Sequence, residues 1–207
     1  MAVSEGADSY FRPATLAEAL GVRAAGAAII AGATDVYPAL VPGIGRDLRP
    51  FGRGARASLD ITGLAELRGI EERDGLWRIG AATTWTEIAD ARLPPAFACL
   101  RLAAREVGGR QIQNRGTIGG NLVNASPAAD GFPPLLALDA EVELQRRGHV
   151  RRLPLSRFVS GPRTTALDPD EILTAILIRQ SQRPARSHFL KLGARRYLVI
   201  SIAMVAA

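Results

Sequence analysis

Two glycine-centred segments carry the residue types that a phosphate-binding site requires. The first is Gly32-Ala33-Thr34-Asp35, and the second is Thr117-Ile118-Gly119-Gly120-Asn121. Glycine has no Cβ and adopts positive φ easily, so a loop built on it can press its backbone N–H groups against a ligand. Successive N–H groups in such a turn form an anion-binding concavity. We therefore expect both segments to be ligand-binding loops.

An acidic residue, Asp130, follows the second segment, and its carboxylate could accept hydrogen bonds from the hydroxyls of a ribose. The alternative for the glycine pair is a tight turn that leads into a strand and binds nothing, because short motifs are weakly specific. The other glycine-centred segment, at residues 32–35, favours the interpretation that both segments bind a ligand.

The composition is that of a globular protein with one large domain or two small ones. The 207 residues are 47% hydrophobic and 22% charged, which excludes an intrinsically disordered chain. No apolar run approaches the roughly 20 residues of a membrane span, and no basic and apolar leader opens the chain. A single cysteine, Cys99, excludes an internal disulfide and a cysteine-ligated metal cluster, and we expect it to pack against a helix. The cytoplasm is the expected compartment.

The net charge of +6 raises the question of nucleic acid binding. The basic residues are almost all arginines and are scattered, and aromatic residues make up only 5%, too few for a base-stacking platform. The densest basic stretch, 146–152, is expected to be the exposed tip of a hairpin. We therefore predict no nucleic acid partner, and we assign no catalytic or metal-binding role to His149 or His188.

The hydrophobic pattern predicts an α+β protein rather than a doubly wound parallel sheet. A Thr15/Glu18 pair and a Thr84/Glu87 pair each have the spacing of a capping box at a helix start. Neither a G-x-G-x-x-G nor a P-loop pattern is present. Helices are expected from Thr15 to about 24, from Thr84, and at 96–106 and 133–138. Strands are expected at 27–31, 57–61, 70–72, 76–80, 141–145, 150–155, 171–178, 189–193 and 200–205.

Four stretches together resemble a known family. They are Ala31–Val36, Asn114–Asn121, Ala125–Asp130, and Lys191–Arg196 with Ile200-Ser201. The family is the FAD-binding (medium) subunit of the molybdenum hydroxylases, such as xanthine dehydrogenase and carbon monoxide dehydrogenase. The resemblance spans essentially residues 9–207.

The resemblance implies a two-lobed PCMH-type FAD-binding fold, with FAD extended between the lobes. Residues 1–60 would form a small N-terminal α/β lobe, and residues 61–182 a larger lobe with an antiparallel sheet. Residues 183–207 would be the beginning of a C-terminal α/β domain that is truncated here.

The resemblance also implies which residues hold the cofactor. Residues 29–36 would line one face of the pyrophosphate and residues 117–121 the opposite face. Asp130 would bind the ribose or adenine end. Val107 and Leu173 would make apolar contacts. Asp35 would cap the following segment or use its backbone N–H. Some members carry a lysine near position 202, where this chain has Ile202. The full set is Ile29, Ile30, Ala31, Gly32, Ala33, Thr34, Asp35, Val36, Val107, Thr117, Ile118, Gly119, Gly120, Asn121, Asp130 and Leu173.

The implied activity is electron transfer through FAD, without a general base or metal in this chain. The molybdenum cofactor and the iron–sulfur clusters would belong to partner subunits, and the organic substrate and the electron acceptor are left open. The alternative is a non-catalytic binding or assembly module that keeps the fold without tightly bound flavin.

Overall fold

The computed structural model describes residues 9–36, 57–181, 184–196 and 198–207. The sequence also predicts an apolar segment at 36–40 and, from its many Gly, Pro and Arg residues, a loop at 42–56, and both lie almost wholly outside the described residues.

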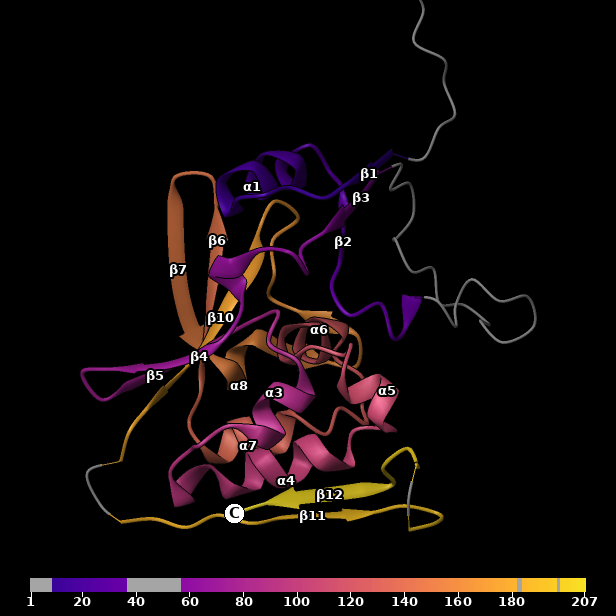
Figure 1. Cartoon of the computed structure of the whole chain (residues 1–207), viewed down its shortest axis with the longest axis vertical. Coiled ribbons are helices and arrows are strands. Elements are labelled where there is room, and N and C mark those ends of the chain that lie inside the picture. The colour runs from indigo at the N-terminus through magenta and orange to yellow at the C-terminus, as the bar shows by residue number, and fades with distance from the viewer. Residues whose placement is uncertain (1–8, 37–56, 182–183, 197) are drawn as a thin grey trace, which may run out of the picture.

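A three-stranded parallel sheet with one helix forms the N-terminal part of the fold (Figure 1). Its strands are β1 (Ser9–Phe11), β2 (Ala28–Ile30) and β3 (Ala57–Asp60), in the order β1-β3-β2. The helix α1 (Leu16–Ala24) begins at Thr15, whose hydroxyl accepts the Glu18 N–H as predicted. Such a cap satisfies one of the free N–H groups of a helix start.

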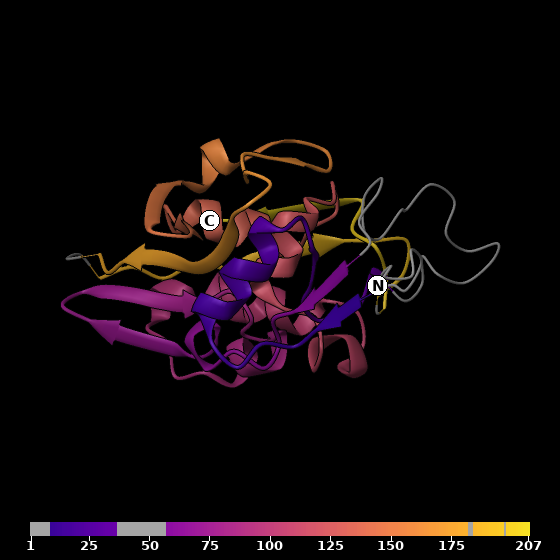
Figure 2. The ribbon, with the colours of Figure 1, turned by 90° about the horizontal axis from the view of Figure 1, so that it is seen from above.

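The second sheet has five antiparallel strands in the order β4-β5-β10-β6-β7. They are β4 (Ile70–Arg73), β5 (Leu76–Gly80), β6 (Glu141–Arg146), β7 (His149–Pro154) and β10 (Ile172–Arg179). In both views the β4–β5 hairpin and the three-stranded sheet lie at opposite ends of the molecule (Figure 1, Figure 2).

The local sequence explains the hairpins of this sheet. Asp74 and Gly75 adopt positive φ of 54° and 73°, the geometry of the tight turn that joins β4 to β5.

Strand β10 was predicted from an alternating pattern, but its first seven residues are all buried. The reason is its central position, since it pairs with β5 on one side and β6 on the other.

Short helices pack against this sheet and carry most of the remaining core. Helix α3 begins with the predicted capping box, in which Thr84 and Glu87 exchange hydrogen bonds. The expected helix 96–106 is divided into a 3₁₀ turn at Pro95–Phe97 and an α-helix that follows. The α-helices here are α3 (Trp85–Asp90), α4 (Ala98–Glu106), α5 (Arg110–Gln113), α6 (Ile118–Asn124), α7 (Phe132–Ala137) and α8 (Leu155–Phe158).

Two strand pairs complete the described part of the chain. The pair β8 (Val159–Gly161) and β9 (Thr164–Thr165) is short, and β11 (Phe189–Leu192) pairs antiparallel with β12 (Ala203–Ala206). The inner face of the β11–β12 pair packs on α4 around Cys99. Cys99 is fully buried, as expected, and burial raises the pKa of its thiol.

Each sheet has its own hydrophobic core. Leu20 of α1 and Leu59 of β3 belong to the first core, and Ile79 of β5 and Ile176 of β10 belong to the second. Ile172, at the start of β10, packs into the first core and so links the two. The α+β class is confirmed. None of the helices in the described ranges has the length and hydropathy needed to cross a bilayer.

Candidate functional site

A cleft of about 730 Å³ lies where the two sheets meet. Its walls come from β2 and the segment after it, from α6, and from the start of β10. This volume suits a cofactor-sized ligand. The residues expected at a cofactor that line this cleft are Ile29, Ala31, Gly32, Ala33, Thr34, Asp35, Val36, Val107, Thr117, Gly119, Gly120, Asn121 and Leu173.

Gly32 brings the first segment directly against the second. A Cβ at Gly32 would lie 1.9 Å from the carbonyl oxygen of Arg115, a backbone atom that cannot move aside. Glycine is therefore required here for close approach. The positive φ of this segment falls instead on Ala33, at 58°, a conformation that is uncommon for a residue with a side chain.

The second segment is not the loop that the sequence predicted. Residues 118–124 form helix α6, and Thr117 is its N-cap. Gly119 is needed because its Cβ would lie 2.6 Å from the carbonyl oxygen of Ala81. The glycine pair thus allows the first turn of α6 to pack against the chain that follows β5, which a local pattern does not show.

The backbone donors of this helix start are already used within the protein. The N–H of Ile118 donates to Thr83 O, that of Gly119 to Ala81 O, and that of Gly120 to Thr117 Oγ1. The expectation that Gly119 and Gly120 offer free N–H groups to a phosphate is therefore wrong for this structure. The Thr117 hydroxyl accepts one bond and retains its own proton, which it can donate into the cleft.

Asp35 turns its carboxylate toward the other wall. Its Oδ2 accepts a hydrogen bond of 2.7 Å from the Asn124 side-chain amide, and the Asn124 side-chain oxygen accepts one from Arg163. Among the cleft-lining residues that the structure describes, Asp35 is the only charged one. Its pairing with Asn124 gives that carboxylate a partner other than a ligand.

A buried acceptor without a donor lies next to the cleft. Asn121 lines the cleft, and its Oδ1 is buried with no hydrogen-bond partner in the described part of the chain. A buried polar atom without a partner is costly. This oxygen lies beside Gly131, where a Cβ would come within 2.8 Å of it, and Gly131 does not line the cleft. The Asn121 Oδ1 is therefore not exposed to a ligand in the cleft.

Three of the expected residues do not line the cleft. Ile30 pairs with Asp60 in the parallel sheet, and Ile118 is fully buried in the second core. The Asp130 carboxylate accepts hydrogen bonds from Lys191 Nζ at 2.8 Å and from the Ser201 hydroxyl. Lys191 and Asp130 thus form an ion pair whose side chains are 5% and 9% exposed.

Comparison with known proteins identifies the group of proteins that shares this arrangement. A family model described as "FAD binding domain in molybdopterin dehydrogenase" matches residues 4–179. The chain belongs to this family. The cofactor of the family is FAD.

Individual relatives of this chain are FAD-binding subunits as well. The chain is 40% identical over 171 residues to the xanthine dehydrogenase FAD-binding subunit of Escherichia coli O157:H7, covering 81% of this chain and 56% of the relative. It is 36% identical over 201 residues to the nicotinate dehydrogenase FAD-subunit of Eubacterium barkeri, covering 93% of this chain and 65% of the relative. The chain therefore spans just over half to two thirds of these relatives.

A solved structure matches the fold as well. Carbon monoxide dehydrogenase from Hydrogenophaga pseudoflava superposes with a TM-score of 0.83 at 25% identity, over 96% of this chain and 68% of that chain. The cleft of this FAD-binding domain is large enough for the cofactor. The hydroxyls of Thr34 and Thr117 on its walls are neutral hydrogen-bond donors of the kind that the FAD pyrophosphate needs.

Several cleft residues were not expected from the sequence. Trp85 is 1% exposed and lies between two glycines, because a Cβ at Gly116 or Gly131 would come within 3.3 or 2.6 Å of its ring. Both glycines are more than 30 residues from Trp85 in the chain, so no local pattern indicates this contact. The cleft residues missed by the sequence are Ile61, Ala81, Trp85, Ile112, Gly116, Val123, Asn124, Leu167, Ile172 and Ile200.

Proposed function

We propose that this chain is the FAD-binding electron-transfer subunit of a molybdenum-containing hydroxylase. The cleft of about 730 Å³ with both glycine-containing segments on its walls carries this proposal. When bound, FAD supplies a carrier that accepts electrons singly and releases two as hydride, while the protein supplies placement and electrostatics.

In this proposal the protein holds FAD in the two-lobed PCMH-type arrangement. One lobe contains the three-stranded sheet and ends near residue 60, and the other contains the five-stranded sheet and ends near residue 182. Residues 183–207 begin a third unit. The separate cores of the two sheets support two lobes, and the first core also includes Ile61, Leu64, Leu67, Ala82 and Ile172 from beyond residue 60. The exposed Leu190 and Val205 on the outer face of β11–β12 support a third unit.

The cofactor contacts in the proposal follow the cleft. Thr34 and Thr117 donate hydroxyl bonds to the pyrophosphate, Asn121 lies on the same face of it as Thr117, and Val107 and Leu173 cover the apolar parts of FAD. Asp130 lies outside the cleft, and its role in the proposal is to hold β11 in place through its ion pair with Lys191. Electrons come from iron–sulfur clusters of one partner subunit, fed by a molybdenum-cofactor subunit, and leave to an external acceptor.

A flavin titration tests this function. The purified protein should be yellow or should bind added FAD, with the visible absorbance of an oxidised flavin and release of FAD on acid treatment. G120V should abolish binding, because Gly120 lines the cleft and its Cβ would already lie 2.9 Å from Thr117 Oγ1. G161V is the matched control, since a Cβ there meets nothing within 4 Å. Folded wild-type protein that is colourless after incubation with FAD and removal of the free cofactor would exclude the proposal.

A further inference from the structure

A buried carboxylate, that of Glu171, lies directly behind one wall of the cleft. Leu167, Ile172 and Leu173 of this wall line the cleft, and Glu171 is next to Ile172 in the chain. The Glu171 side chain is only 1% exposed, and it does not line the cleft. A charge in such a position is costly unless it is paired and hydrogen-bonded, so its partners matter.

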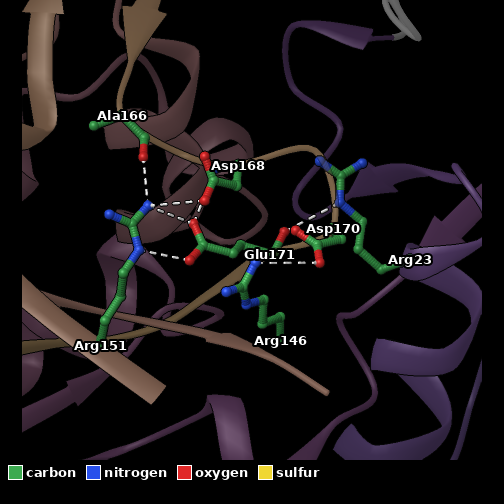
Figure 3. Close-up of polar contacts among 7 residues, drawn as sticks. All are labelled: Arg23, Arg146, Arg151, Ala166, Asp168, Asp170 and Glu171. Carbon is green, nitrogen blue, oxygen red and sulfur yellow. Dashed lines mark hydrogen bonds and ion pairs between the residues drawn. The ribbon is translucent and has the colours of Figure 1, made fainter. Parts of the chain in front are cut away.

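Arg151 of β7 holds both ends of the turn that carries Leu167 (Figure 3). Its Nε and Nη2 donate to the two carboxylate oxygens of Glu171 at 2.6 and 2.7 Å, and Nη2 also donates to the carbonyl oxygen of Ala166 at 2.7 Å. The Asp168 N–H donates to Glu171 Oε2 at 2.9 Å. Two-pronged arginine–carboxylate contacts fix direction as well as distance.

Arg23, at the end of α1, joins this turn to the opposite wall. Its Nε donates to the carbonyl oxygen of Glu171 at 3.1 Å (Figure 3). Its Nη1 donates to the carbonyl oxygen of Ala27 at 2.8 Å. Ala27 directly precedes β2, which runs into the first glycine-containing segment. One side chain therefore spans from the main chain of one wall to the strand that carries the other.

We propose that Glu171 is a positioning residue for the FAD cleft, and that with Arg151 and Arg23 it fixes segment 166–173 relative to segment 29–36. The inference rests on the proposed function, because it concerns the same cleft. Glu171 contacts no ligand in this proposal. It acts by holding Leu167 and Leu173 at the distance from β2 that the cofactor needs.

The charge state of Glu171 agrees with this role. Burial by itself raises the pKa of the carboxyl, but the hydrogen bonds from Arg151 and from the Asp168 N–H, together with the charges of Arg151 and Arg146, outweigh burial and lower the pKa. The carboxylate is thus ionised at neutral pH, and Arg151 remains charged beside it. Both partners keep the form that the two-pronged contact requires.

The experiment compares E171Q with a matched variant of the same sheet. E143Q also alters a carboxylate held by two arginine nitrogens, those of Arg152 at 2.8 and 3.0 Å, but Glu143 does not line the cleft. A glutamine there can still accept the bond that the Thr174 hydroxyl donates to Glu143 Oε1. We expect E171Q to raise the Kd for FAD by about tenfold, the lower end of what partners behind a ligand shell contribute. E143Q should leave the Kd within a factor of two or so of the wild type. Circular dichroism would first establish that both variants are folded at the temperature of the titration.

A double-mutant cycle separates positioning from general stability. E171Q and R151M should not add in their effect on the Kd, because both break the same link. The visible circular dichroism of bound flavin should change in E171Q and not in E143Q. An unchanged Kd and flavin spectrum in folded E171Q would overturn the inference and leave the proposed function standing.

Hydrogen exchange without flavin tests the inference independently of FAD binding. In E171Q, amides of segments 166–173 and 29–36 should exchange faster together, whereas E143Q should leave both as in the wild type. R151K keeps the charge but not the two-pronged contact, and it takes the place of E171Q if that variant does not fold. Unchanged exchange in both segments would overturn the inference even if the wild type bound no FAD.

Discussion

Thr117 shows how one side chain serves both the fold and the proposed cofactor contact. Its hydroxyl caps α6 by accepting the Gly120 N–H at 3.0 Å, and the residue lines the cleft. A hydroxyl can accept and donate at once, so capping does not prevent a bond to phosphate. With the amides of Ile118 and Gly119 bonded inside the protein, this hydroxyl becomes the main polar contact that α6 can offer.

The variant T117V should therefore lose both functions. We expect stability to fall by about 1 kcal/mol from the lost cap, and FAD to bind more weakly because the donor is gone. The variant T15V is the control, since Thr15 caps α1 in the same way and does not line the cleft. Urea unfolding and flavin titration measure the two effects. Equal FAD affinity in T117V and T15V would show that the Thr117 hydroxyl does not contact the cofactor.

At the scale of elements, the cleft depends on contacts between strands and helices distant in sequence. Gly32 touches the backbone of Arg115, and Gly119 touches that of Ala81. The Asp130–Lys191 pair likewise ties β11 to the chain before α7, and Lys191 Nζ also donates to Glu106 O at the end of α4. These three links join the segment after β2, the segment after β5 and strand β11 to the chain around helices α4 to α7.

The buried Asp130–Lys191 pair should be sensitive to removal of one partner. K191M leaves the Asp130 carboxylate buried without its cation, which should cost about 3–5 kcal/mol of unfolding free energy. D130N with K191M should cost less than the sum of the single changes. Urea unfolding measures the cycle. The exposed Arg73–Asp74 pair, with both side chains 92% exposed, supplies the control R73M, which should leave stability as it is. Additive effects of D130N and K191M would show that the pair is not coupled.

For the whole molecule, acid should lower the stability of the fold. Several carboxyls, those of Glu171, Asp60 and Glu87, have pKa values lowered by hydrogen bonds and nearby arginines against the opposing effect of burial. A carboxyl whose pKa is lower in the folded than in the unfolded state stabilises the fold above its unfolded pKa. That stability is lost as the pH falls through the folded pKa.

We expect E171Q to flatten the acid side of the stability profile. The ordinary pKa of this carboxyl is 4.5, so the wild-type advantage should be full above that pH and should shrink below it. One carboxyl can steepen the profile by at most about 1.4 kcal/mol per pH unit. Urea unfolding from neutral pH to about pH 3 measures both curves, and some acid loss should remain in E171Q from Asp60 and Glu87. Parallel curves would contradict a lowered pKa for Glu171.

The sequence by itself determined the local elements and the family. The N-cap at Thr15, the capping box at Thr84, the Asp74-Gly75 turn and the α+β class depend on neighbouring residues and on periodicity, which act over a few positions. The full capping box expected at Thr15 is not formed, because the Glu18 side chain accepts from the Ala14 N–H instead. The two glycine-containing segments also marked the walls of the cleft correctly. Their pattern identified the FAD-binding family.

Only the tertiary structure decided what those glycines do. Gly119 and Gly120 lie in the first turn of a helix and not in a loop. Glycine is required at position 119 because a Cβ there would meet the carbonyl oxygen of Ala81, nearly forty residues earlier in the chain. Asp130 lies outside the cleft because Lys191 holds it, and Glu171 lies behind the cleft because Arg151 and Arg23 come to it from other elements. Such contacts depend on which distant segments are brought together, and no local pattern of residue types encodes that distance.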